Sequence, residues 1–290
     1  MDFMNIPSIQ RESGDKKPTF DHASIIEFRN VSFQYPGSSN YALRNLNLKI
    51  YGDKKLCIVG ANGSGKTTFI KLLTRLYSPT EGEILLNDIN INEYDMEEYQ
   101  ALFAPVFQDY NIYNLTLASN IALSNEYDAK KIEDVGTRSG LSSLVWELPK
   151  GYHTQVLKNL DPEGIEPSGG ESQKIAIARA MYHDAPLYLL DEPTAALDPG
   201  AEYEIYSKFN EMITDRAAIL ITHRLSAVQL ADVVAVFDAG IVVEYGTHVE
   251  LYERGGIYNE MFDKQAQFYR DNQTAPSADR VPIAEVEEIR

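Results

Sequence analysis

The fold is decided by "LCIVGANGSGKT", residues 56–67, where an apolar run leads directly into the pattern G-x-x-x-x-G-K-[S/T]. The overlapping stretch "KTTFIKLLTRLY", residues 66–77, has the apolar spacing of a helix that ends before Ser78 and Pro79. A strand, a glycine-rich turn and a helix start form a phosphate cradle, because the amides of the turn point inward and the helix dipole is positive at that end. The stretch therefore predicts a nucleotide phosphate site in preference to a glycine-rich turn that binds nothing.

The side chains of this loop have separate expected roles. Lys66 is placed to reach the β and γ phosphates of a nucleotide, and the hydroxyl of Thr67 is placed to bind Mg²⁺. The expected phosphate-binding residues are Gly60, Asn62, Gly63, Ser64, Gly65, Lys66, Thr67 and Thr68.

The composition indicates a folded, acidic chain. Of its 290 residues, 44% are hydrophobic and 24% are charged, which suffices for one large domain or two smaller ones. The formal charge of −17 opposes the counterion release that drives proteins onto DNA or RNA, so we expect no nucleic-acid partner. The one cysteine, Cys57, has apolar neighbours and is expected in the core of a protein from a reducing compartment.

The remaining apolar runs predict an α/β fold. Three short runs, "LYLLDE" (187–192), "AAILITH" (217–223) and "VVAVFD" (233–238), are separated by helical stretches, which is typical of a mostly parallel sheet buried on both faces. All apolar runs fall short of the roughly 18 residues of a membrane-spanning helix, so we expect the chain itself to be soluble.

Other segments predict the elements around this sheet. Residues 1–24 are polar and read as a linker, and 269–290 read as a flexible tail. The alternation in "IIEFRNVSFQY" shifts phase by one residue, which predicts a strand with a bulge. "LKIYGDKKLCIVG" predicts two strands, "DAGIVVEYGT" a hairpin, residues 117–150 helices with Trp146 in the core, and "GGIYNEMFDKQAQFYR" a closing helix.

Two carboxylates end the run "LYLLDE". Asp191 is expected to hold Mg²⁺ directly or through water, and Glu192 to polarise an attacking water as general base. An ordinary strand followed by an acidic turn is the alternative, and the nearby phosphate loop makes the functional interpretation the stronger one.

A second glycine-rich helix start, "PSGGESQKIAIARA", occupies residues 167–180. The hydroxyl of Ser168, the amides of Gly169 and Gly170 and the helix dipole can form another phosphate cradle. The same residues fit a capping box, S-x-x-E, in which Glu171 turns back to the Ser168 amide. Both interpretations are compatible, and the box is expected to keep the Glu171 charge away from the phosphate.

A GTPase or a small-molecule kinase also has a phosphate loop, but no guanine-reading N-K-x-D sequence is present and neither class explains "PSGGE". With its ordered motifs, the chain from about residue 25 to residue 268 resembles the nucleotide-binding domain of an ATP-binding cassette (ABC) transporter. That resemblance implies a P-loop NTPase core, an antiparallel β subdomain and a helical subdomain at about 109–185 that carries the signature motif L-S-G-G-Q. Here Pro167 and Glu171 depart from that motif.

The resemblance implies further site residues, one position at a time. Tyr35 matches the aromatic residue that stacks on adenine, although a chain with 18 tyrosines makes this match weaker. Gln108 matches the glutamine that senses Mg²⁺ and water and contacts the membrane part of the transporter. His223 matches the histidine that contacts the γ phosphate, and Asp198 matches a loop that acts across a dimer.

In that family two such domains face head to tail, and each ATP lies between the phosphate loop of one domain and the signature of the other. The resemblance therefore explains the two glycine-rich helix starts as two half-sites. It implies ATP and Mg²⁺ as cofactors and a second nucleotide-binding domain as partner, in a homodimer or a heterodimer.

Three stretches resemble bacterial exporters in particular: "VSFQYPG" (31–37), "FQDYNIYNLTLASNIAL" (107–123) and "GYHTQV" (151–156). The resemblance implies a transmembrane domain as partner, a place at the cytoplasmic face of the cell membrane, and ATP hydrolysis coupled to export. "FMNIPSIQRESGD" (3–15) resembles the connector that follows a membrane domain, so we expect a domain of a longer chain. A non-transport ABC ATPase with a mechanical or regulatory role is the alternative; an exposed apolar surface near 109–117 favours the transporter, and a basic groove favours the alternative.

Overall fold

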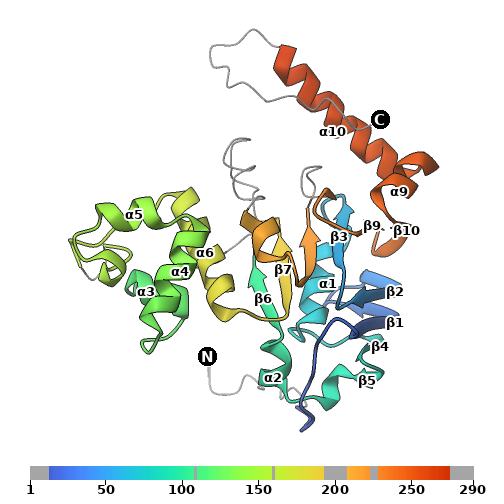
Figure 1. The fold of residues 1–290 in the computed structure, drawn as a ribbon. Coiled ribbons are helices and arrows are strands. Elements are labelled where there is room, and N and C mark those ends of the chain that lie inside the picture. The colour runs from blue at the N-terminus through green and yellow to red at the C-terminus, as the bar shows by residue number, and fades with distance from the viewer. Residues whose placement is uncertain (1–12, 108–109, 159–160, 193–207, 223–227, 275–290) are drawn as a thin grey trace.

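A six-stranded sheet forms the centre of the structure, a computed structural model that describes residues 13–107, 110–158, 161–192, 208–222 and 228–274 (Figure 1). Neighbouring strands of this sheet run parallel, except for the antiparallel hairpin at one edge. The predicted parallel sheet and hairpin are therefore confirmed. In spatial order the strands are β10 (Ile241–Gly246), β9 (Val233–Asp238), β3 (Lys55–Gly60), β8 (Ala217–Ile221), β7 (Leu187–Asp191) and β6 (Phe103–Val106).

A second sheet is antiparallel, as the resemblance implied. On β1 the pairing register shifts between Phe28 and Val31, which confirms the predicted bulge. The two strands predicted in residues 48–60 both exist, but they belong to different sheets and do not pair with each other. In spatial order the strands are β2 (Tyr41–Tyr51), β1 (Ile25–Gln34), β4 (Glu81–Leu86) and β5 (Ile89–Asn90).

Helix α1 (Lys66–Leu73) packs between the two sheets. The ring of Phe69 on α1 stacks on Phe28 of β1 at a centroid distance of 4.7 Å and meets Phe237 of β9 at 5.7 Å. All three rings are buried. Because both sheets hold α1, the loop between β3 and α1 has a rigid support on each side.

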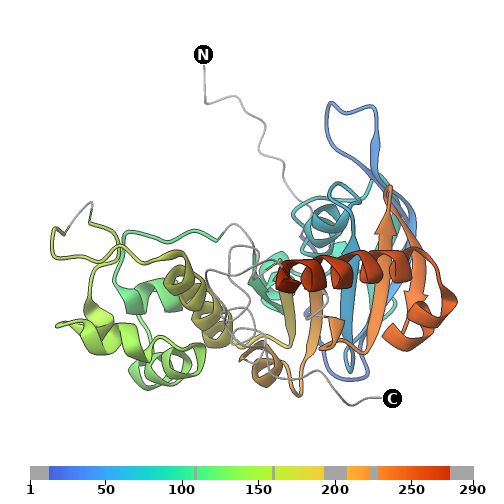
Figure 2. The same cartoon turned by 90° about the horizontal axis from the view of Figure 1, so that it is seen from above.

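The helical part lies to one side of the central sheet in both views (Figures 1 and 2). Its longest helix, α6, contacts α3, α4 and the edge strand β6. The elements of this part are α3 (Leu117–Ala122), α4 (Ala129–Ser139), α5 (Ser142–Glu147), η3 (Gly151–His153) and α6 (Gly169–His183). Further helices of the described chain include η2 (Ile91–Glu93), α2 (Met96–Gln100), α9 (His248–Arg254) and α10 (Ile257–Thr274).

Two expectations about the helices are wrong. Helix α1 ends at Leu73 instead of continuing to Tyr77, because Arg75 adopts a positive φ of 57° and the amide of Leu76 bonds back to the Lys71 carbonyl at 2.8 Å. Trp146 is not in the core: it is 91% exposed, because α5 presents it outward and buries none of its own residues.

Both ends of the described chain are more ordered than their polar composition suggested. The amides of Gly14 and Lys16 bond to the carbonyls of Tyr94 and Glu93, at 3.2 and 3.1 Å, so part of the expected linker is attached to the domain. At the other end α10 continues to Thr274, into the segment expected to be a tail.

Candidate functional site

The candidate site lies at one edge of the central sheet. Strands β3, β8 and β7 are adjacent and parallel, so their carboxyl ends meet at this edge. The phosphate loop follows β3, and Asp191 ends β7. Strand order therefore brings together two motifs that are far apart in the sequence, as ligand sites of open α/β sheets require.

Two glycines of the loop are required by the backbone. At Gly60 a Cβ atom would lie 2.2 Å from the Phe237 carbonyl oxygen, and at Gly65, the N-cap of α1, it would lie 2.6 Å from the Leu43 side chain. Both have positive φ values, 156° and 106°. The first turn of α1 thus begins directly at the loop, where helix amides have no partner within the helix.

Lys66 lies inside this loop. Its ammonium group donates to the Gly60 carbonyl at 2.8 Å and the Ala61 carbonyl at 3.1 Å, and the side chain is 6% exposed. Burial lowers the pKa of Lys66, and the nearby charges of Glu192 and Asp191 oppose that shift. Lys66 and the two carboxylates therefore share one electrostatic environment.

The two carboxylates differ in their setting. Asp191 is buried at the end of β7, whereas Glu192 is partly exposed. Glu192 has a positive φ of 46°, unusual for a residue with a side chain, and its amide bonds to the Ile221 carbonyl of β8 at 2.9 Å. This bond fixes the Glu192 backbone beside β8, at the sheet edge where the glycine loop and Asp191 meet.

The donors around the loop fit a nucleotide phosphate with Mg²⁺. The Ser64 hydroxyl is buried without a hydrogen-bond partner among the described residues, and the Thr67 side chain is exposed at the start of α1. The described residues contain no group of three or more metal-binding side chains. Mg²⁺ needs only one or two protein ligands when phosphates supply the others, so Thr67 and Asp191 are a sufficient set.

Tyr35 lies beside the first turn of α1. Its hydroxyl is 3.1 Å from the Thr68 hydroxyl, and its ring meets the rings of Phe33 and Tyr77 edge to face. The Lys71 ammonium lies 5.5 Å from the ring centroid. These contacts hold a half-buried aromatic ring next to the phosphate loop, where an adenine could stack on it.

The second glycine-rich start is the N-terminus of α6, and its predicted capping box is confirmed. Ser168 is the N-cap, the Glu171 amide donates to its hydroxyl oxygen at 3.3 Å, and the Glu171 carboxylate accepts from the Ser168 amide at 2.7 Å. The same carboxylate also accepts the Ser168 hydroxyl proton at 2.8 Å. The Glu171 carboxylate therefore lies beside the Ser168 hydroxyl, and the expectation that the box keeps its charge away from a phosphate stays a prediction.

Two residues that sequence reasoning missed join α6 to the segment 110–120. The Tyr110 hydroxyl donates to the Gly169 carbonyl at 3.1 Å, and the Arg179 guanidinium donates to the carbonyls of Asn111 at 3.2 Å and Asn120 at 3.0 Å. Burial lowers the pKa of Arg179. The position of Arg179 in the apolar run "IAIARA" (175–180) was the available signal, because a buried charge needs partners.

Three of the expected site residues, Gln108, Asp198 and His223, lie outside the described residues. The described ones fall into two groups. Tyr35, the phosphate loop, Asp191 and Glu192 belong to the sheet region, whereas Ser168, Gly169 and Gly170 belong to the helical part, on the other side of β6 and β7 (Figure 1).

The fold and the phosphate site together define an ATPase domain of the P-loop class. The sequence model of the ABC transporter family matches residues 43–195, more than half of the chain, and the chain belongs to that family.

Relatives of the chain include exporters. It is 40% identical over 259 residues to the subtilin transport ATP-binding protein SpaT of Bacillus subtilis, covering 88% of this chain and 42% of that protein. It is 38% identical over 259 residues to the ATP-dependent lipid A-core flippase of Escherichia coli (strain K12), with 88% and 44% covered. A solved bacterial Atm1-family ABC exporter with ATP bound matches at a TM-score of 0.80 and 32% identity, with 89% and 46% covered.

The chain thus spans less than half the length of these relatives. In the part of the chain that the structure describes, no helix is long and apolar enough to cross a membrane.

Proposed function

We propose that this chain binds and hydrolyses ATP and that the hydrolysis drives export through a transmembrane domain. The observation that carries the proposal is the meeting of the glycine loop, Lys66, Asp191 and Glu192 at one sheet edge. The exporter relatives support the transport role.

Each residue then has a role in phosphoryl transfer. The loop amides and Lys66 bind the β and γ phosphates, and Tyr35 stacks on the adenine. Thr67, Asp191 and Gln108 would hold Mg²⁺, which would neutralise phosphate charge. Glu192 accepts a proton from the attacking water, and His223 contacts the γ phosphate.

A second nucleotide-binding domain is needed to enclose the nucleotide. Because the phosphate loop and Ser168 lie on different parts of one chain, two copies placed head to tail would form two equivalent sites, with Asp198 acting across the dimer. A homodimer satisfies this geometry, and so does a heterodimer whose other chain carries a different signature.

A transmembrane domain is the second proposed partner, which places the chain at the cytoplasmic face of the cell membrane. Three large apolar side chains of the segment before and after α3 are exposed: Tyr113 at 44%, Leu115 at 38% and Leu123 at 56%. Exposed apolar side chains on one segment are typical of a protein interface. They favour the transporter over a non-transport ABC ATPase, for which a basic groove was the expected feature.

Light scattering of a hydrolysis-deficient chain tests the paired sites. Glu192→Gln should shift from monomer to dimer on addition of ATP and Mg²⁺, since a ligand that binds the closed state favours it by mass action. Adding Ser168→Arg should remove the dimer while ATP binding remains. If Glu192→Gln stays equally monomeric with and without ATP, the homodimer proposal fails for the isolated chain.

A further inference from the structure

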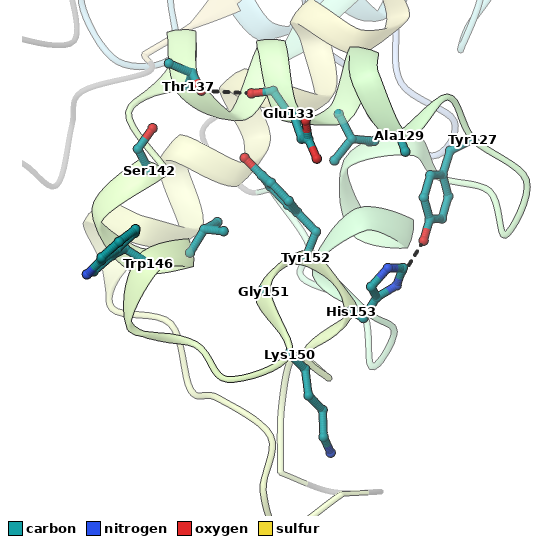
Figure 3. Close-up of a pocket in the computed structure, with 12 residues that line it drawn as sticks. Tyr127, Ala129, Glu133, Thr137, Ser142, Trp146, Lys150, Gly151, Tyr152 and His153 are labelled. Atoms are coloured by element: carbon teal, nitrogen blue, oxygen red, sulfur yellow. Dashed lines mark hydrogen bonds between the residues drawn. The ribbon is translucent and has the colours of Figure 1, made fainter.

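The helical part carries an open hollow of about 770 Å³ between α4, α5 and η3 (Figure 3). Its size is in the range that small ligands or a few peptide residues occupy. None of the residues assigned above to nucleotide binding lines it, and neither do Tyr113, Leu115 or Leu123. Side chains that line the hollow include Tyr127, Ile132, Glu133, Val145, Trp146 and Tyr152.

An aromatic ring in a fixed position forms one wall. The Tyr152 hydroxyl lies against α4, where a Cβ atom on Gly136 would be 2.0 Å from it, so any side chain at position 136 would displace the tyrosine. Burial raises the pKa of Tyr152, and the Glu133 charge raises it further, so the phenol is neutral at physiological pH. A neutral, immobilised ring presents a stable π face to a ligand.

The charge facing this ring is negative. The Glu133 carboxylate extends from α4 toward Tyr152 (Figure 3), and no cation of the described residues pairs with it. Lys150 also lines the hollow, but its side chain extends away from Glu133 (Figure 3) and is bound to Glu163 at 3.0 Å and Asp161 at 3.8 Å. His153 is engaged with the Tyr127 hydroxyl at 3.4 Å. The hollow therefore presents an acid without a counter-charge.

Trp146 stands at the rim of the hollow and is the most exposed large apolar residue described, at 91%. A tryptophan in this position leaves its ring in water unless another molecule covers it. An aromatic ring beside a free carboxylate suits a cation carried on an apolar stem, because the cation pairs with the acid while the stem and the charge contact the rings.

We propose that this hollow is a docking site for an arginine or lysine side chain of a peptide segment from another protein. The Glu133 carboxylate pairs with the cationic group, most strongly when that group is a guanidinium, and the rings of Tyr152 and Trp146 contact the cation and its aliphatic stem. The choice of a basic peptide rests on charge complementarity at Glu133, in a chain whose formal charge is −17.

The fluorescence of Trp146 tests the proposal directly, because it is the one tryptophan of the chain. The probes are the peptide acetyl-Leu-Arg-Leu-amide and its neutral citrulline analogue. The arginine peptide should change the emission saturably, and the citrulline peptide should bind several-fold more weakly. Because Glu133 is exposed, Glu133→Gln should weaken the arginine peptide by roughly two- to fivefold, the usual worth of an ion pair at an exposed site.

Glu147→Gln is the matched control, because it removes one charge from the same surface without removing a lining residue of the hollow. Trp146→Ala, followed by calorimetry, should also weaken the arginine peptide, and because Trp146 is exposed the substitution removes no buried side chain. The proposal is overturned if the arginine peptide causes no saturable change, if citrulline binds equally well, or if Glu133→Gln and Glu147→Gln have the same effect.

Discussion

Replacing Glu171 by glutamine tests whether the Glu171 charge weakens phosphate binding at the half-site formed by Ser168, Gly169 and Gly170. The Glu171 carboxylate lies 2.8 Å from the Ser168 hydroxyl oxygen and accepts its proton. A hydrogen bond from that hydroxyl to phosphate would span about 2.7 Å, so the carboxylate and phosphate oxygens would lie within about 5.5 Å. Two unit charges at that distance repel by ~3 kcal/mol at an effective dielectric constant of 20 and by ~0.8 kcal/mol in bulk water. Because Glu171 is partly exposed, we expect about 1 kcal/mol per site.

A glutamine removes this repulsion and keeps the cap. Its carbonyl oxygen can still accept from the Ser168 amide, and its amide group can donate to the Ser168 oxygen, which frees the hydroxyl proton for phosphate. With two sites per dimer, Glu171→Gln should therefore tighten the ATP-dependent dimer by about 2 kcal/mol, or roughly 30-fold in its dissociation constant.

Sedimentation equilibrium with ATP and Mg²⁺, in the Glu192→Gln background, measures this constant. Glu166→Gln is the matched control, because Glu166 bonds to the Lys158 amide and not to Ser168. A dimer no tighter than that of the Glu166 control would refute the argument that the Glu171 charge weakens the phosphate site.

Further outcomes test other parts of the structure. Lys66→Ala should abolish ATP binding in calorimetry, and retained affinity would contradict the loop assignment. Glu192→Gln should keep ATP binding and lower turnover by about 10² to 10⁴-fold, the usual contribution of a general base. Near-normal turnover would show that another residue is the general base. Tyr110→Phe loses only the hydrogen bond to the Gly169 carbonyl, so it should lower the ATP turnover rate more than the ATP affinity. An unchanged turnover rate would show that hydrolysis does not depend on this bond. Burial lowers the pKa of His248 below 6.5. The folded protein therefore favours the neutral imidazole, and its melting temperature should fall as the pH drops from 6.5 through the lowered pKa. His248→Phe should flatten this pH dependence when melting temperatures are measured across the same pH range.

The sequence by itself was sufficient for the local features. The phosphate loop, the bulge of β1, the hairpin of β9 and β10 and the capping box at Ser168 all follow from residues close together in the chain, whose backbone preferences or alternation specify the conformation. The parallel sheet also follows, because apolar runs buried on both faces have a recognisable composition.

Only the tertiary structure decided which of these features meet. Strand order places Asp191 and the glycine loop at one edge, and no local rule predicts the order of six strands. The amide of Glu192 bonds to Ile221 of β8, and the partners of Tyr110 and Arg179 also come from segments distant in sequence.

The exposure of Trp146 is another feature that the sequence alone did not predict. Its apolar character favours burial, but whether a tryptophan is covered depends on which elements pack beside its helix, and α5 has its neighbours on the other face. Glu171 is a second instance: its capping role is local and was predicted, whereas the contact of its charge with the Ser168 hydroxyl depends on the side-chain geometry that the folded helix start imposes. Sequence determines what each short segment can form; the packing of distant segments determines which side chains share a site, because those contacts are non-local.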